Sequence, residues 1–392
     1  MVTVGEAKKI IEENIQSLAP LRFPLETAGG KILAEDIYAL SDIPAYPQSS
    51  MDGYAISFAG WQQHKKLNIE GESAAGNDKA PAILPVQAMR IFTGAPVPAG
   101  ADTVVMQEKT KMENGILLID DEKLQRGNNV RAVGSEIKKG DLGLGKESLL
   151  TPAAVGFLAG IGLTSVSAYP SPAVSIIITG NELQQPGLPL GAGQVYESNS
   201  FTLKTILRQS GIDNIDIHHA DDKLESVVTV LDRVLTNSDL VLLTGGISVG
   251  DYDFVLQATI ACSVQQLFHK VKQRPGKPLY FGKKDNKIVF GLPGNPSSVL
   301  TCFYQYVLPA ISLLSKKELR LKTIKVPLAK KIQKTTNLTH FLKGLYNGAT
   351  VTELDAQESY KMNSFAKANC LIQVNEESTE CKEGELVEIH LL

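Results

Sequence analysis

Three stretches of the chain place glycine, hydroxyl and acidic residues directly after runs of aliphatic residues. They cover 179–182, 244–253 and 291–298. Glycine lets backbone N–H groups approach an anion closely, and serine and threonine add hydroxyl donors. If the aliphatic runs are parallel strands of one sheet, all three stretches meet at its carboxyl edge. The pattern therefore predicts a phosphate-binding site at that edge.

Charged residues near these stretches extend the predicted chemistry. Carboxylates that could give oxygen ligands to Mg²⁺ are Glu182, Asp221, Asp222 and Asp253. Arg274 and Lys277 could pair with phosphate or another oxoanion. Taken singly, a Gly-Gly pair is more often a turn, an Asp pair a helix cap and a lysine a surface residue. Together they favour a metal-assisted site for a phosphorylated ligand.

The elements that must position these residues form a multidomain α/β plus β protein. Strands expected at 174–178, 215–217, 240–243 and 287–290 alternate with helices, which predicts a doubly wound parallel α/β domain over 169–316. Short alternating runs predict a small inserted β domain over 41–134, with strands at 82–84, 89–92, 103–106 and 116–119. Similar runs predict a β-barrel-like C-terminal domain over 317–392.

An elongated helix-containing domain is expected from 1–40 together with 135–168. Its first helix begins at a capping box, with Thr3 as N-cap and Glu6 reaching back, and Pro20 is expected to end it. Thr151 and Pro152 begin a second helix. The first helix is amphipathic, so it needs a partner surface from this chain or from another copy.

Composition excludes several classes of partner. The 392 residues carry a net charge of −3 and contain no long basic block, which argues against nucleic acid. The N-terminus lacks the apolar segment of a signal peptide, and no apolar run approaches the length of a membrane span. The four cysteines lie far apart, which excludes a zinc knuckle and a disulfide framework and fits a reducing cytoplasm.

Two further motifs, Ser-Ser-Met-Asp-Gly-Tyr-Ala at 49–55 and Thr-Gly-Ala-Pro-Val-Pro at 93–98, can be explained as turns. Together with other motifs, however, they resemble the molybdopterin molybdenumtransferases, the MoeA family, which is related to the E domain of gephyrin. The other matching motifs are Val-Val-Met-Gln-Glu (104–108), Thr-Gly-Gly-Ile-Ser-Val-Gly (244–250), Arg-Pro-Gly-Lys-Pro (274–278) and Gly-Leu-Pro-Gly-Asn-Pro (291–296). They occur in the family's order along most of the chain.

The resemblance implies an enzyme that inserts molybdate into adenylylated molybdopterin, with Mg²⁺-dependent release of AMP, to give molybdenum cofactor. It implies a homodimer whose active sites are shared between subunits, and a transient contact with the molybdopterin adenylyltransferase. The residues implied in catalysis are Asp52, Thr93, Glu182, Asp253 and Lys277. The residues implied in substrate binding are Glu136, Thr179, Gly245, Gly246, Ser248, Arg274, Gly294, Asn295, Pro296, Ser297 and Ser298. The implied metal ligands are Glu182, Asp221 and Asp222.

Two positions depart from the family pattern, since Glu136 stands where many relatives have Asp and Arg274 where others have Lys. Two other functions are open at this point. A related pterin-binding domain adenylylates molybdopterin with ATP, but the inserted segment that contains 49–55 argues against that reaction. A scaffold protein is the other alternative, and the acidic and basic set at Glu182, Asp253 and Lys277 favours chemistry instead.

Overall fold

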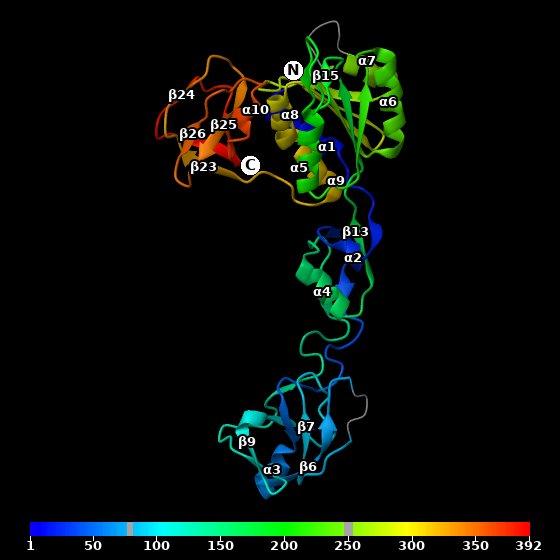
Figure 1. Ribbon diagram of the computed structural model, residues 1–392, viewed down its shortest axis with the longest axis vertical. Coiled ribbons are helices and arrows are strands. Elements are labelled where there is room, and N and C mark those ends of the chain that lie inside the picture. Colours follow the sequence, from blue (N-terminus) through cyan, green and yellow to red (C-terminus); the bar gives the residue numbers. More distant parts are fainter. Residues whose placement is uncertain (77–80, 247–253) are drawn as a thin grey trace. The chain divides into compact units, whose positions relative to one another are not determined.

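The computed structural model describes residues 1–76, 81–246 and 254–392 of the chain. It divides into two compact units (Figure 1). The first unit contains residues 1–21, 30–32 and 167–392, and the second contains 22–29 and 33–166. The chain passes from one unit to the other at four points. Three of them, 21–22, 32–33 and 166–167, lie within the strands β1 (Leu21–Pro24), β2 (Ile32–Leu33) and β13 (Ser165–Tyr169). The finer division into four domains stays a prediction.

The first unit is built around a six-stranded sheet of order β17-β14-β18-β22-β21-β19. Four strands are parallel neighbours: β17 (Ile215–Ala220), β14 (Val174–Thr179), β18 (Leu240–Thr244) and β22 (Lys287–Leu292). The two others, β21 (Pro278–Lys284) and β19 (Gln265–Lys270), pair antiparallel. The α/β class is confirmed, and the four strands that the sequence predicted are parallel neighbours. Strands β21 and β19 were not predicted, and they add an antiparallel edge through the hairpin that links β21 to β22.

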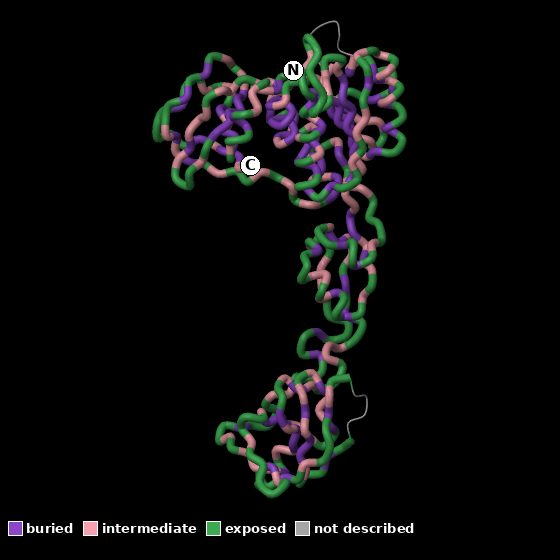
Figure 2. The backbone as a smooth tube through the Cα atoms, viewed as in Figure 1, coloured by how far each residue is buried: buried purple, intermediate pink, exposed green. Residues whose placement is uncertain are grey.

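Both faces of this sheet are covered, as the continuous aliphatic strands require. On one face Ile176 and Leu242 share a core with Leu203 of α5 (Asn199–Gln209) and Val299 of α8 (Pro296–Cys302). On the other face Ile177 and Leu243 pack with α6 (Leu224–Asn237) and α7 (Phe254–Ala261). Figure 2 shows buried residues along these strands. The sheet is therefore held rigidly on both faces, and its carboxyl edge can keep the residues of a site in fixed positions.

The N-terminal helix α1 (Val4–Asn14) has the predicted capping box, in which Glu6 N–H donates to Thr3 and Thr3 N–H donates to Glu6. It ends at Asn14, well before Pro20, because Ile15 adopts an extended conformation. Its buried side chains, among them Ile11, belong to the same core as Leu314 of α9 (Leu308–Ser315). The partner surface that the helix needs therefore comes from its own chain.

The helical stretch that follows β22 is the longest apolar one described. It comprises α8, the π-helix η2 (Phe303–Val307) and α9. By length and composition residues 296–315 could cross a membrane, but 78% of the most apolar window is buried inside the unit. Phe303, Tyr306 and Ile311 are fully buried in the core that contains α1. This stretch is therefore a core helix of the α/β part.

The C-terminal strands form a sheet of order β20-β25-β27-β29-β23. Its members are β20 (Gln273–Arg274), β25 (Thr339–Tyr346), β27 (Cys370–Val374), β29 (Leu386–Leu391) and β23 (Thr323–Pro327), while β26 (Val351–Glu353) pairs with β25. The described pairings run from β20 to β23 without joining those two strands, so the barrel-like form stays a prediction. Strand β20 belongs by sequence to the α/β part, so one strand of that part joins the C-terminal sheet.

The second unit contains a six-stranded sheet of order β8-β5-β7-β6-β10-β9. Its strands are β5 (Gly53–Ile56), β6 (Lys66–Ser73), β7 (Gln87–Ile91), β8 (Thr103–Met106), β9 (Thr110–Glu113) and β10 (Ile116–Ile119). Residues 82–84 are not a strand, although Ile83 N–H donates to the Ala99 carbonyl. Helix α4 (Pro152–Gly160) has Thr151 as N-cap, as predicted.

The remaining elements of the chain are short. They are β1 (Leu21–Pro24), α2 (Leu25–Ala28), β2 (Ile32–Leu33), β3 (Ile37–Tyr38), β4 (Gln48–Ser49), α3 (Phe58–His64), η1 (Gln107–Lys109), β11 (Val130–Arg131), β12 (Leu142–Leu144), β13 (Ser165–Tyr169), β15 (Leu183–Gln184), β16 (Val195–Tyr196), β24 (Ile332–Gln333), α10 (Met362–Phe365) and β28 (Glu380–Cys381).

Candidate functional site

A cavity of about 660 Å³ lies at the carboxyl edge of the α/β sheet, and we call it the strand-end cavity. Its lining residues come from the ends of β14, β18 and β22 and from two other segments. They are Thr179, Glu182, Leu183, Val195, Tyr196, Glu197, Ser198, Asn199, Thr244, Gly245, Gly294, Asn295, Pro296, Tyr360 and Met362. The structure therefore brings the described parts of the three predicted stretches to one cavity.

Gly245 makes the close approach of β18 to β14 possible. Its φ is +83°, a conformation that side chains other than glycine rarely adopt, and an added Cβ would lie 2.3 Å from the Thr179 carbonyl oxygen. Thr179 also donates its hydroxyl to the Thr244 carbonyl at 3.3 Å. The ends of β14 and β18 are thus held together by main-chain geometry. Glu182, which follows β14, is exposed at the cavity.

Asn295 connects the last strand end to the C-terminal part. It is the N-cap residue of α8, but its side chain does not cap the helix. Its Nδ2 instead donates to Ser359 Oγ at 2.9 Å, and Ser297 N–H donates to the Ser359 carbonyl at 3.1 Å. Ser297 and Ser298, predicted to bind substrate, are buried and do not line the cavity, because this first helical turn packs inward.

The predicted metal carboxylates are not gathered into one group. Asp221 lines a neighbouring cavity of about 960 Å³, which shares only Leu183 and Glu197 with the strand-end cavity. Asp222 accepts the Asn181 N–H at 3.1 Å and donates its own N–H to Asn181 Oδ1 at 3.3 Å. Within the described part of the chain no three His, Cys, Asp or Glu side chains lie close enough to hold a metal ion.

These two aspartates also do not cap a helix, which is the common role of an Asp pair. Helix α6 starts at Leu224 with Lys223 as N-cap, and its N-cap side chain makes no hydrogen bond. The exchange between Asp222 and Asn181 instead joins the ends of the neighbouring strands β17 and β14. Asp222 therefore has a clear structural role at the edge of the sheet.

In the predicted basic pair, Arg274 is the last residue of β20 and Lys277 lies on the turn that leads to β21. Arg274 and Lys277 are both exposed, and neither lines the strand-end cavity. Arg274 pairs with His340 of β25 in the sheet register. Ser248 and Asp253 lie outside the described residues, and Gly246, which is described, does not line the cavity.

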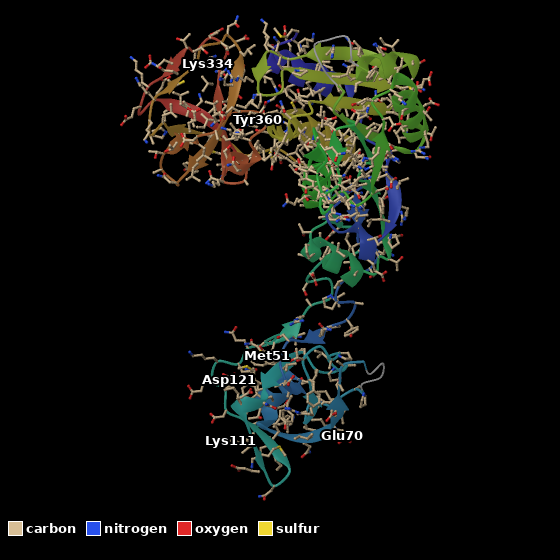
Figure 3. All side chains as sticks on the ribbon, turned by 45° about the horizontal axis from the view of Figure 1, so that its top comes forward. Met51, Glu70, Lys111, Asp121, Lys334 and Tyr360 are labelled. Atoms are coloured by element: carbon tan, nitrogen blue, oxygen red, sulfur yellow. The ribbon has the colours of Figure 1, made fainter. Side chains whose placement is uncertain are left out.

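In the second unit Asp52 and Thr93 form a direct pair. Asp52 Oδ1 accepts the Thr93 N–H at 2.7 Å and the Thr93 hydroxyl at 2.8 Å. These two hydrogen bonds, the backbone one first, lower the pKa of Asp52 below its ordinary value. Both residues are exposed, so the pair offers an ionised carboxylate to solvent. Figure 3 labels Met51, the neighbour of Asp52 in this exposed segment. Glu136 is also exposed in this unit.

Comparisons with known proteins cover the whole chain. A curated molybdopterin molybdenumtransferase of Haemophilus influenzae is 34% identical, with all of both chains covered. One from Staphylococcus epidermidis is 33% identical over all of this chain and 95% of its own length. The chain belongs to the MoeA family of molybdopterin molybdenumtransferases. It is accordingly a transferase of molybdenum cofactor biosynthesis.

Family models match in three parts. The MoeA N-terminal region (domain I and II) matches residues 2–162, a probable molybdopterin binding domain matches 175–313, and the MoeA C-terminal region (domain IV) matches 325–392. A crystal structure of a molybdopterin biosynthesis MoeA protein from Pyrococcus horikoshii covers the full chain with a TM-score of 0.84 at 28% identity, with 99% of that chain covered. All three strand-end stretches fall within the part that resembles a molybdopterin-binding domain.

Several lining residues of this MoeA-family chain escaped the sequence reasoning. Glu197 is only 6% exposed and faces both cavities. It accepts the Ser200 N–H at 2.8 Å, so it caps α5 in place of Ser198, whose side chain makes no capping bond. The Glu-Ser-Asn-Ser sequence carries that signal, because an acidic side chain before a helix can accept its first free N–H groups. Tyr360 and Met362 carry no comparable local signal.

Proposed function

We propose that the chain inserts molybdate into adenylylated molybdopterin, with Mg²⁺-dependent release of AMP, to give molybdenum cofactor. The observation that carries the proposal is the strand-end cavity, where glycine-lined strand ends, threonines and Glu182 meet within the region similar to a molybdopterin-binding domain. Glycine backbone and hydroxyl donors suit the phosphates of the ligand. Family membership adds the class of reaction.

The residues present fit a Mg²⁺ that is shared with the substrate. Mg²⁺ in proteins is commonly held by one or two carboxylates together with substrate phosphates, so a three-carboxylate cluster is not needed. Glu182 is exposed at the cavity and is the ligand that we propose. When bound, the ion would polarise a phosphoryl oxygen and neutralise charge on the departing AMP.

Residues of the chain would orient the substrate. Gly245 and Gly294 leave room for the phosphates against the backbone, and Thr179 braces the two strand ends through its bond to the Thr244 carbonyl. Water then cleaves the phosphoanhydride and AMP leaves, while molybdate exchanges an oxo ligand for the two dithiolene sulfurs and that oxygen departs as water with the two thiol protons. We also propose that the exposed cations Arg274 and Lys277 hold the incoming oxoanion, although neither residue lines the cavity itself.

We further propose a homodimer in which Asp52 and Thr93 of one copy complete the site of the other. Mixing two inactive variants tests this. D52A and E182A should each be inactive alone, and a mixed population that exchanges subunits should regain AMP release. No recovery in the mixture, while each variant remains dimeric, would argue against shared sites. A cytoplasmic location and a transient contact with the adenylyltransferase stay predictions.

The central experiment is product analysis with the purified full chain. It is incubated with adenylylated molybdopterin, Mg²⁺ and molybdate or tungstate, and AMP and metal-loaded pterin are measured. AMP release that requires the oxoanion supports the proposal. A second reaction contains ATP and molybdopterin without molybdate, and rapid formation of the adenylylated pterin there would establish the adenylyltransferase function instead.

A further inference from the structure

One wall of the strand-end cavity is made by residues 354–364 of the C-terminal part. This segment contains a loop and the first residues of α10, and we call it loop 354–364. Tyr360 and Met362 of this loop line the cavity together with the strand ends of the α/β sheet. Tyr360 is 63% exposed. Figure 3 shows it on the side of the C-terminal strands that is nearer to the α/β part. The ring is therefore available to a ligand in the cavity.

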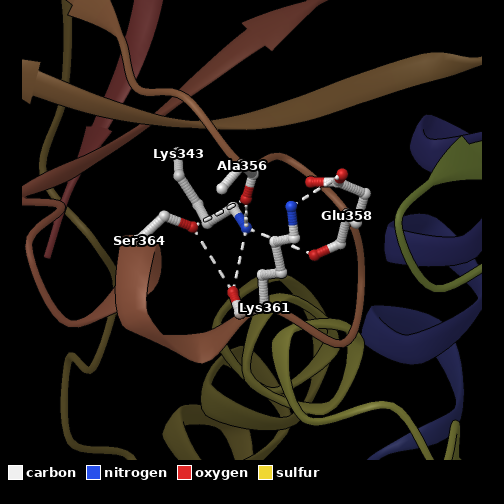
Figure 4. Close-up of polar contacts among 5 residues, drawn as sticks. All are labelled: Lys343, Ala356, Glu358, Lys361 and Ser364. Carbon is white, nitrogen blue, oxygen red and sulfur yellow. Dashed lines mark hydrogen bonds and ion pairs between the residues drawn. The ribbon is translucent and has the colours of Figure 1, made fainter.

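The loop is organised around a buried lysine of β25. Lys343 is only 2% exposed, and its Nζ donates to the carbonyl oxygens of Ala356 at 2.7 Å, Lys361 at 3.1 Å and Glu358 at 3.4 Å (Figure 4). Ser364 Oγ donates to the same Ala356 carbonyl at 2.8 Å. All three ammonium protons are thus directed at the main chain of the loop.

Gln357 holds the loop to β25 through two further hydrogen bonds. Lys343 N–H donates to Gln357 Oε1 at 3.0 Å, and Gln357 Nε2 donates to the Lys343 carbonyl at 2.9 Å. Ser359, two residues further along the loop, contacts the α/β part, because its Oγ accepts a hydrogen bond from the Asn295 side chain. Tyr360 therefore follows directly after the residue that docks the loop onto the cavity.

Burying the charged ammonium of Lys343 costs free energy, so stability alone does not explain this arrangement. Burial lowers the pKa of Lys343, because the charged ammonium loses its water. Its hydrogen-bond partners in the loop are neutral carbonyls, since Glu358 accepts from it through the main chain. A buried charge held in this way contributes little net stability compared with an apolar side chain of similar size. What it supplies is a fixed path for loop 354–364.

The cavity lining also contains a second aromatic side chain on which a planar ring could stack. Tyr196 of β16 is a second exposed tyrosine in its lining, at 47% exposure, and its hydroxyl is tied to the Leu188 carbonyl at 3.0 Å. Aromatic rings stack on flat conjugated heterocycles, and each such contact raises affinity about tenfold. The ligand of the proposed reaction has two such rings, the pterin and the adenine.

We propose that Tyr360 contacts a planar ring of the adenylylated pterin and that Lys343 is the positioning residue that holds Tyr360 at the cavity. This inference rests on the proposed function for the identity of the ligand. It assigns substrate recognition to a segment of the C-terminal part. The role of Lys343 is indirect, since it acts only through the loop that carries Tyr360.

The chain supplies a matched control for Lys343. Lys334 is also buried, at 5% exposure, and its Nζ donates to the carbonyls of Leu338 at 2.9 Å, Glu376 at 3.0 Å and Asn375. None of these residues lines the strand-end cavity. K334M and K343M therefore remove the same buried charge and the same kind of bond, and only the second loosens a cavity wall.

The first test is the Michaelis constant for adenylylated molybdopterin in the full chain. Y360A should raise KM about tenfold with little change in kcat, as expected for the loss of one ring contact. Y360F should behave like the wild type, because stacking does not need the hydroxyl. K343M should raise KM in the same way, while K334M should leave KM unchanged even if it lowers the melting temperature.

Amide hydrogen exchange gives the second readout. K343M should speed exchange in loop 354–364, whereas K334M should leave that loop protected. An unchanged KM in Y360A, or equal KM changes in K343M and K334M, would overturn the inference while the wild type remains active. If the wild type releases no AMP, the proposed function is what fails. Calorimetric binding of AMP and of molybdopterin to the wild type and Y360A then decides the ring contact, and equal affinities for both ligands would overturn it.

Discussion

Mild acid should weaken the C-terminal sheet through one buried histidine of β25. His340 is 7% exposed, and its Nε2 lies 2.8 Å from Thr336 Oγ1. Burial, followed by the nearby cations Arg274 and Lys334, lowers its pKa from the ordinary 6.5 to about 4. The folded chain therefore keeps this ring neutral at a pH where the unfolded chain protonates it.

The sign and size of the effect follow from that difference. Between pH 6.5 and pH 4 the unfolded state binds a proton that the folded state does not, so the free energy of unfolding falls as the pH falls. Above pH 6.5 the ring is neutral in both states and the effect vanishes. At about 1.4 kcal/mol per pKa unit, lowering the pH from 6.5 to 5 removes about 1.5 kcal/mol of stability.

A second buried histidine of this sheet is a poorer choice for the test. The pKa of His390 is also lowered to about 4, chiefly by burial. However, Glu388 Oε1 lies 3.4 Å from its Nε2, and a carboxylate at that distance favours the charged ring. The two influences oppose each other at His390. Among the residues that the structure describes, the charged groups that shift the pKa of His340 are two cations, Arg274 and Lys334.

The assay compares urea unfolding of the wild type and H340Q at pH 6.5 and pH 5. Glutamine keeps a hydrogen-bonding side chain but does not titrate, so the difference between the two proteins isolates this ring from all other groups. Circular dichroism follows the whole chain, and the single tryptophan, Trp61, reports on the second unit. The wild type should lose about 1.5 kcal/mol more than H340Q. Equal losses would refute the argument that the buried ring stays neutral.

Three shorter predictions concern the site and the second unit. E182A should abolish AMP release and leave the oligomeric state unchanged in size-exclusion chromatography, and unchanged turnover would remove Glu182 from the mechanism. D52N should lower turnover about tenfold or more, because it weakens two hydrogen bonds from Thr93 to a charged acceptor, with Trp61 fluorescence unchanged. G53A should destabilise the second unit by about 3 kcal/mol, since its Cβ would lie 1.8 Å from a carbonyl oxygen of β8. A normal urea midpoint in G53A would contradict that clash.

The sequence predicted the elements whose local pattern is unambiguous. Strands β14 and β18 are continuous aliphatic runs, and such runs are typical of strands buried on both faces. The caps at Thr3 and Thr151 were predicted for the same reason, because an N-cap depends on residues within one turn. The end of α1 at Asn14 was missed, since the favourable pattern continued toward Pro20 and only the extended conformation of Ile15 stops it.

The two antiparallel strands of the α/β sheet had no comparable signal. Strand β21 begins with Pro278 and contains Gly282, residues that are usually depleted in strands. Gly282 is nevertheless required, because an added Cβ would lie 2.7 Å from the Gln265 carbonyl oxygen on the neighbouring strand β19. Its place in the sheet is therefore decided by the close approach of another strand, which no local pattern reveals.

The residues of the candidate site also fall into those that the sequence predicts and those that depend on tertiary contacts. The strand-end glycines and Glu182 could be predicted because a parallel sheet necessarily brings the carboxyl ends of its strands to one edge. Lys343 and Tyr360 could not, because a lysine in a strand and a tyrosine in a loop look like ordinary surface residues in sequence. Their importance depends on a carbonyl-lined pocket that forms only when loop 354–364 folds over β25. Sequence motifs therefore locate the part of the cavity that we propose to bind phosphate, while the residues that shape its opposite wall follow only from tertiary contacts.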